Sequence, residues 1–208
     1  MEIRQARRDD HDDIADFTSD TWGDRFERGD YIADVFPDWV AADGPEQRTI
    51  VAENRGRVIG VCQAVLLSEH EAWTQGMRVA DDARANGVAE AMNDGCFDWA
   101  RERGATVCRN MVFSWNVAGL GAARGVGYAP ATEFRWAHPD PDVDAHADRN
   151  GASEFDVVPD PDAAWGFWQN SDANRELAGL TLDPEESWAL SECTRERFRD
   201  AAEEHAVF

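Results

Sequence analysis

The chain has 208 residues, enough for one domain or for one domain with an additional fragment. Asp and Glu number 42 against 20 basic residues, which gives a formal net charge of −22 and argues against nucleic acids and anionic membranes as partners. With 43% hydrophobic residues, the chain can nevertheless build a core, so its composition also excludes a fully disordered protein.

All basic residues are Arg, and Lys is absent. The acidic residues are spread along the whole chain, whereas a partner-binding tail would gather them in one block. A dense carboxylate surface keeps a protein hydrated when molar salt screens its self-repulsion. The composition therefore resembles that of cytoplasmic proteins from extreme halophiles. A partner with a basic surface is the alternative explanation.

The cysteines do not indicate a metal site. Cys62, Cys96, Cys108 and Cys193 show no CxxC or metal-ligand spacing, so we expect small buried hydrophobic residues and no metal. We find no signal peptide and no apolar run of transmembrane length. These features predict a cytoplasmic protein.

The N-terminal part predicts a strand over residues 2–7 and a helix that begins at Asp9 and Asp10. A second helix is expected over residues 30–42, although Pro37 makes an unbroken helix doubtful.

Two β-rich runs follow, at residues 49–53 and 58–67. They are joined by Asn54-Arg55-Gly56-Arg57, which suits a tight hairpin. A fourth strand is expected at residues 72–79.

The next helix is expected over residues 88–103. Its apolar residues recur at helical spacing and form one stripe that faces a sheet: Val88, Met92, Cys96 and Trp99. A strand at residues 106–114, a short helix at 117–124 and a sixth strand at 128–136 complete the pattern. This order predicts a mixed α/β sheet with helices on both faces.

The most informative motif lies between the fourth strand and the long helix. It reads Arg84-Ala85-Asn86-Gly87-Val88-Ala89. A turn that ends in Gly at a helix N-terminus presents several backbone N–H groups and the positive end of the helix dipole. That combination binds phosphate without a cationic pocket.

The motif resembles the pyrophosphate loop of the GNAT family, the Gcn5-related N-acetyltransferases, which reads Arg/Gln-x-x-Gly-x-Gly/Ala. The surroundings also resemble the family's order of parts: Met77-Arg78-Val79 at the end of a strand, Asn116 at the start of a helix, and Gly127-Tyr128. Residues 1–137 are therefore identified as a GNAT domain. The implied fold is α/β (α+β), with a mixed, mostly antiparallel sheet of six to seven strands.

The resemblance implies that acetyl-CoA binds along the fourth strand, where strands four and five splay apart. The backbones of Met77 and Val79 would hold the pantetheine and the thioester oxygen. Residues Arg84, Ala85, Asn86, Gly87, Val88 and Ala89 would hold the pyrophosphate. Asn116 would contact the pantetheine arm, and a plain helix N-cap is the alternative.

The chain departs from the family at the proton-transfer positions. Many members carry a Tyr where this chain has Ala123, and some carry a Glu where it has Trp73. We expect Glu71 to act as the base, directly or through water, with His70 as the second candidate. An ordinary solvent-facing acid is the alternative for Glu71.

The resemblance implies an N-acetyltransferase acting on a primary amine of a small molecule or peptide. The acceptor region holds many Asp, which would attract a cationic amine. Its aromatic residues, Trp22, Tyr31, Phe36 and Trp39, could line a pocket or belong to the core. The alternative function is a non-catalytic acyl-CoA-binding or regulatory module.

The remainder divides into an acidic linker at residues 138–153 and an extension at 154–208. The extension predicts a strand at 154–158, a helix at 160–170, and a helix start at Asp183-Pro184 that leads into one or two helices. It resembles the opening of a second GNAT repeat. The alternative is a helical extension that packs on the first domain or across a homodimer.

Overall fold

The computed structural model describes residues 1–19, 21, 29–135, 160–204 and 207. They fall into two compact units. The first unit comprises Met1–Ala129 together with Asp183–Ala189, and the second comprises Pro130–Leu182 with Leu190–Phe208. Within the described residues, no helix combines the length and the apolar character needed to cross a membrane.

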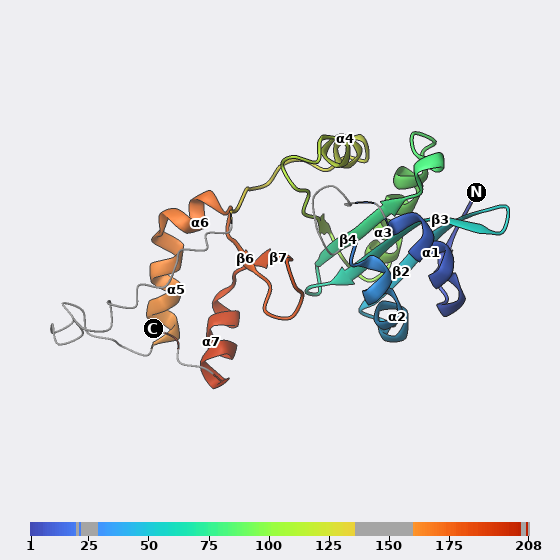
Figure 1. The fold of residues 1–208 in the computed structure, drawn as a ribbon. Helices are drawn as coiled ribbons and strands as arrows, with labels where there is room; N and C mark the ends of the chain where they lie inside the picture. Colours follow the sequence, from blue (N-terminus) through green and yellow to red (C-terminus); the bar gives the residue numbers. More distant parts are fainter. Residues whose placement is uncertain (20, 22–28, 136–159, 205–206, 208) are drawn as a thin grey trace, which may run out of the picture. The chain divides into compact units, whose positions relative to one another are not determined.

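A five-stranded sheet forms the centre of the first unit (Figure 1). Its strands lie in chain order: β1 (Glu2–Gln5), β2 (Gln47–Asn54), β3 (Arg57–Leu66), β4 (Glu71–Val79) and β5 (Val107–Arg109). The first four pair antiparallel, and β5 pairs parallel to β4. The sheet is therefore mixed and mostly antiparallel, as the sequence predicts.

The predicted hairpin between β2 and β3 is confirmed. Asn54 pairs with Arg57, and the two residues between them, Arg55 and Gly56, have φ values of 54° and 81°. Positive φ at both central positions defines the turn whose twist matches paired strands.

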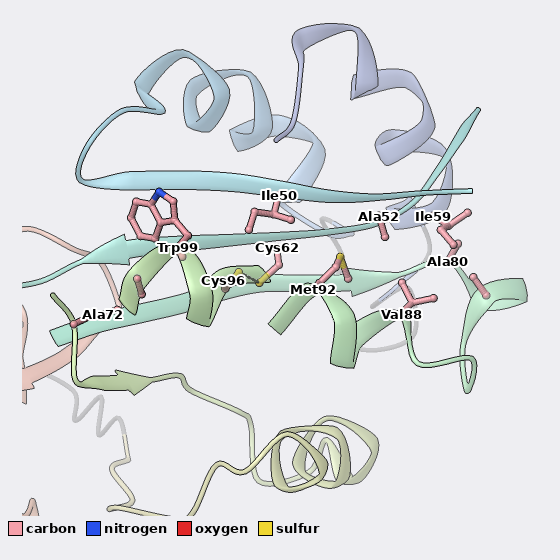
Figure 2. Close-up of a cluster of buried hydrophobic side chains, with 14 residues drawn as sticks. Ile50, Ala52, Ile59, Cys62, Ala72, Ala80, Val88, Met92, Cys96 and Trp99 are labelled. Atoms are coloured by element: carbon pink, nitrogen blue, oxygen red, sulfur yellow. Dashed lines mark hydrogen bonds between the residues drawn. The ribbon is translucent and has the colours of Figure 1, made fainter. Parts of the chain in front are cut away.

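One face of the sheet packs on α3 (Val88–Arg101), as Figure 2 shows. The predicted stripe is confirmed, since Val88, Met92, Cys96 and Trp99 are all buried. They meet alternate residues of the strands, among them Ile50 and Ala52 of β2 and Cys62 and Ala64 of β3. This alternation places every second strand residue in the opposite core.

The opposite face packs on α1 (His11–Thr18), which follows a short 3-10 turn at Arg8–Asp10, and on α2 (Ile32–Ala42). In Figure 2 these helices lie across the sheet from α3. Fully buried Ile14, Ile32 and Phe36 contact the sheet here. Helices therefore cover both faces.

A hydrogen bond explains why α2 is unbroken although it contains Pro37. Pro37 lies inside the unbroken helix and has no N–H for the carbonyl of Ala33, four residues earlier. His11 Nε2 donates to that carbonyl instead, at 3.1 Å. A side chain of α1 thus replaces the missing bond.

The prediction of a sixth strand at residues 128–136 is wrong for the residues that the structure describes. Residues 128–135 form no strand. Gly127 is left-handed, with a φ of 96°, and Pro130 offers no N–H to a ladder. Tyr128 N–H donates to the carbonyl of Ala123 and so closes α4 (Val117–Gly125) rather than pairing with β5.

The second unit contains α5 (Pro161–Asn170), α6 (Asp172–Glu176), β6 (Leu180–Leu182), β7 (Leu190–Glu192) and α7 (Arg195–Glu204). The helix expected at 160–170 is confirmed, with Asp160 as its N-cap. Trp165 of α5 packs edge-on against Phe198 of α7. The linker at 138–153 and the strand at 154–158 lie outside the described residues.

The helix start predicted at Asp183 is wrong. Asp183 Oδ1 accepts hydrogen bonds from the N–H groups of Glu185 and Glu186, as a cap would. No helix follows, because the Asp183 N–H donates to Ala189 and closes the segment into a loop. A single helix, α7, begins later at Arg195.

Candidate functional site

A cavity in the first unit opens where two neighbouring strands stop pairing. β4 and β5 are paired as far as Trp73 and Arg109. Beyond this pair, residues 74–78 of β4 and residues 110–113 after β5 line the same cavity. Main-chain groups without a strand partner can be satisfied by a ligand that lies between them.

The cavity has a volume of about 770 Å³, in the range typical of small-molecule sites. Its aromatic lining residues are Tyr31, Trp39, Trp73, Phe113 and Trp188. Its charged lining residues, among those described, are Arg78 and Glu186. Arg78 is paired with the fully buried carboxylate of Asp30.

β4 carries an extra residue where it borders the cavity. Val61 pairs with Arg78 and Gln63 pairs with Gln75, so Gly76 and Met77 together lie opposite Cys62. Gly76 has a φ of 65°, which L side chains rarely adopt. This β-bulge interrupts the ladder at Met77, a residue whose backbone is expected to hold the coenzyme.

The glycine loop has the geometry of an anion site. Ala85 and Gly87 are both left-handed, with φ values of 61° and 75°, and Gly87 is the N-cap of α3. Left-handed residues at alternate positions make successive N–H groups converge, and the first turn of α3 adds its free N–H groups. The Asn86 amide braces the loop by donating to the carbonyl of Arg84 at 2.9 Å.

The cations beside this loop are already paired. Arg84 forms an ion pair with Asp81, and Arg57 forms one with Asp82, each at 2.7 Å. Arg84 Nε also donates to the carbonyl of Val79 at the end of β4, at 3.2 Å. Backbone N–H groups, rather than free cations, are therefore the main attraction for an anion here.

Asn116 has the capping role that was the alternative to coenzyme contact. Its Oδ1 accepts a hydrogen bond from the N–H of Gly119 at 2.9 Å, at the start of α4. Asn116 also lines the cavity. Capping leaves room for a contact with a bound ligand, which stays a prediction.

Glu71 and His70 lie at the beginning of β4 and are not among the residues that line the cavity. Glu71 is 1% exposed, so the alternative of a solvent-facing acid is wrong. Its Oε1 is ion-paired with Arg109 of β5, and its Oε2 accepts a hydrogen bond from Ser68 at 3.2 Å. The catalytic role of either residue stays a prediction.

A phenol joins β4 to β5 close to the last paired residues. Tyr128 OH lies 2.7 Å from Thr74 Oγ1 and 3.4 Å from Cys108 Sγ, and its ring packs edge-on against Phe97. Burial raises the pKa of Tyr128 far above its usual range, so the phenol stays protonated near neutral pH.

One polar residue of the cavity was missed by the sequence reasoning. Glu186, on the Asp183–Ala189 loop of the first unit, accepts a hydrogen bond from Gln75 Nε2 at 2.9 Å. Burial raises the pKa of Glu186, and the hydrogen bond from Gln75 opposes this only in part. No local pattern relates two residues that are 111 positions apart.

Residues 11–128 match the model of the acetyltransferase (GNAT) family. The chain belongs to the GNAT family. No curated protein matches the chain.

Solved structures agree with the GNAT fold. A transcriptional regulator from Bacillus halodurans C-125 is 18% identical, with a TM-score of 0.55 over 66% of this chain and 98% of that one. AAC(6')-Iy, solved with the bisubstrate analogue CoA-S-monomethyl-acetylneamine, is 15% identical, with a TM-score of 0.56 over 67% of this chain and 98% of that one. The aminoglycoside 6'-N-acetyltransferase AAC(6')-IG from Acinetobacter haemolyticus is 15% identical, with a TM-score of 0.54 over 68% and 100%.

Because the chain belongs to the GNAT family, Ala123 bears on how a leaving thiolate would be protonated. This residue, at the position where many members carry a Tyr, lines the cavity and has no proton to donate. A proton for a leaving thiolate must therefore come from another group.

Proposed function

We propose that the chain is an acetyl-CoA-dependent N-acetyltransferase that moves an acetyl group to a primary amine by direct attack. The observation that carries this proposal is the cavity between β4 and the chain after β5, which begins where their pairing ends. An acetyl thioester placed there lies against the backbone of the β4 bulge. Backbone donors can then stabilise the negative charge that develops on the carbonyl oxygen.

The coenzyme would lie along β4 and reach α3. The backbones of Met77 and Val79 would hold the pantetheine and the thioester oxygen, Asn116 would contact the arm, and the loop from Arg84 to Ala89 would hold the pyrophosphate. The left-handed Ala85 and Gly87 support the last assignment. No metal is needed for this chemistry.

Acetyl transfer needs a base for the ammonium group and a proton for the leaving thiolate. Tyr128, buried between Thr74 and Cys108, is not among the described residues that line the cavity, so we propose that the amine nitrogen supplies the proton for the thiolate. The expected base, Glu71 or His70, stays a proposal. The ion pair of Glu71 with Arg109, outside the cavity lining, favours a carboxylate elsewhere.

The first test is calorimetric titration of acetyl-CoA into the protein in molar KCl, followed by CoA release with a panel of primary amines. The panel contains benzylamine, spermidine, a peptide with a free N-terminus, and neamine, since similar folds include aminoglycoside acetyltransferases. Micromolar binding with CoA release supports the enzyme. Binding without release points to the non-catalytic acyl-CoA module, and a folded protein that does not bind contradicts both.

We further propose that the protein works in the salt-rich cytoplasm of an extreme halophile. The absence of Lys and the net charge of −22 support this proposal. All four cysteines are free thiols, which suits a reducing compartment. Unfolding temperatures that rise steadily from 0.1 to 3 M KCl are expected, whereas a protein most stable at low salt would contradict this origin.

A further inference from the structure

We propose that the Asp183–Ala189 loop forms the acceptor side of the cavity, and that Glu186 is the catalytic carboxylate that binds the substrate's ammonium group and accepts its proton. This inference rests on the proposed acetyl transfer to an amine. It adds a residue from a segment outside the part of the chain that matches the family model, which ends at residue 128.

A hydrogen bond fixes the position of Glu186. Gln75 Nε2 donates to Glu186 Oε1 at 2.9 Å and to Gln63 Oε1 at 2.7 Å, so both amide hydrogens are used. Because an ionised carboxylate only accepts hydrogen bonds, the Gln75 amide must turn its nitrogen toward Glu186. Gln75 directly precedes the Gly76–Met77 bulge, and Glu186 lines the same cavity as both bulge residues.

The charge environment suits a cation. In the described lining, Glu186 is the only carboxylate, and no described arginine forms an ion pair with it, in a chain with 42 acidic residues. Desolvation raises the pKa of Glu186. A half-buried carboxylate without a cation attracts an ammonium group, and a raised pKa makes it a better acceptor for its proton.

The backbone of the same loop is strained next to this carboxylate. Trp188 has a φ of 68°, an uncommon conformation for a bulky residue, and its half-exposed ring lines the cavity. Strain of this kind persists where the surrounding structure requires it, and it gathers at binding sites. The ring offers an apolar surface for the carbon that carries the amine, and the Glu186 carboxylate attracts the ammonium group. Together they point to a cationic primary amine as the substrate class.

The reaction balances with these groups. R–NH₃⁺ transfers one proton to the Glu186 carboxylate and becomes R–NH₂. Its nitrogen lone pair attacks the thioester carbon, the C–N bond forms, and the C–S bond breaks with its electron pair on sulfur. The second proton leaves nitrogen for the thiolate, giving R–NH–CO–CH₃ and CoA–SH, and Glu186 returns its proton to solvent.

The test compares Glu186→Gln with wild type, using the panel amine that wild type acetylates fastest. Gln keeps the size of Glu and an oxygen for Gln75, but it cannot take a proton. We expect kcat/KM to fall about 100-fold or more, with the dissociation constant of acetyl-CoA changed less than about twofold. Glu185→Gln, the exposed neighbour that does not line the cavity, is the matched control and should keep the wild-type rate.

A pH profile separates a chemical role from a structural one. Besides Asp183 on its own loop, the described titratable groups that line this cavity are Tyr31, Cys62 and Arg78. Those paired with its lining are Asp30, Tyr128 and Cys96. The wild-type kcat/KM should fall on the acid side as Glu186 becomes protonated. Glu186→Asp should keep this acid limb, and Glu186→Gln should lose it.

Each outcome decides a different question. A Glu186→Gln variant with the wild-type rate and acid limb overturns the role of Glu186 while the acetyltransferase stands. A Glu186→Gln variant that no longer binds acetyl-CoA places Glu186 in the coenzyme site and also overturns this role. Wild-type protein that binds acetyl-CoA but acetylates no amine of the panel overturns the proposed function and this inference together.

Discussion

The indole ring of Trp39 lies directly against the backbone of Gly76. A Cβ built on Gly76 would stand 2.4 Å from Trp39 Cη2 and 3.1 Å from Ile32 Cδ1. Real Cβ atoms essentially never come as close to another atom as the contact with Trp39 would require, so α2 holds the β4 bulge through a contact that only Gly permits. The bulge also needs the left-handed φ of 65° at this residue.

Gly76→Ala should therefore destabilise the protein twice over. The left-handed conformation costs an L residue about 1 to 2 kcal/mol, and the overlap with Trp39 adds about 1 to 3 kcal/mol. Gly56→Ala is the matched control, because Gly56 has a φ of 81° but no atom within 4 Å of its added Cβ. Urea unfolding in molar KCl gives both free energies of unfolding, and equal losses would show that the Trp39 contact is unimportant.

Gly87→Glu should abolish acetyl-CoA binding, because it places a side chain and a negative charge where the pyrophosphate is expected. Gly179→Glu makes the same exchange in the second unit, at a φ of 78° compared with 75° for Gly87. Both variants carry similar strain and the same added charge. Calorimetry should find binding only in the Gly179 variant, and unchanged affinity in Gly87→Glu would remove the pyrophosphate assignment.

Asp81→Asn should strengthen acetyl-CoA binding. It removes a carboxylate beside the loop and frees Arg84 from an exposed ion pair. We expect a gain of severalfold at 0.1 M KCl, corresponding to about 0.5 to 1 kcal/mol, which should vanish near 3 M as salt screens exposed charges. Asp98→Asn breaks a similar exposed pair, with Arg101 in the last turn of α3, and should change nothing. Equal effects of both variants would mean that only the net charge matters.

Glu71→Gln tests the expected base. If Glu71 takes part in proton transfer, turnover should fall more than coenzyme affinity. Arg109→Met is the control, because it breaks the same ion pair but keeps the carboxylate, at a cost of about 3 to 5 kcal/mol for the uncompensated buried charge. Because this ion pair is buried, we expect both variants to lose stability. We also expect Glu71→Gln and Arg109→Met to have the same turnover number. Turnover lost only in Glu71→Gln would assign the chemistry to Glu71.

Local patterns predicted the local parts of this fold. The apolar stripe of α3 and the Arg55-Gly56 turn depend on residues a few positions apart, and both are confirmed. The strand expected at residues 128–136 does not form over the described residues 128–135, because Tyr128 N–H donates to Ala123 of α4 and Pro130 has no N–H for a ladder. The hydrogen bond between Gln75 and Glu186 depends on how the Asp183–Ala189 loop folds back onto the first unit, so no local sequence motif predicts it.

The contribution of the hydrogen bond between His11 and Ala33 to stability can be measured by combining substitutions of His11 and Pro37. His11→Ala leaves the Ala33 carbonyl without its donor, and an orphaned backbone group costs about 1 to 3 kcal/mol. Pro37→Ala restores the N–H that an ordinary helix supplies to this carbonyl. His11→Ala should therefore cost less in the Pro37→Ala background, and a double-mutant cycle should give a coupling energy of about 1 kcal/mol. Additive effects would mean that the carbonyl finds another partner, and the tolerance of α2 for Pro37 would then need a different explanation.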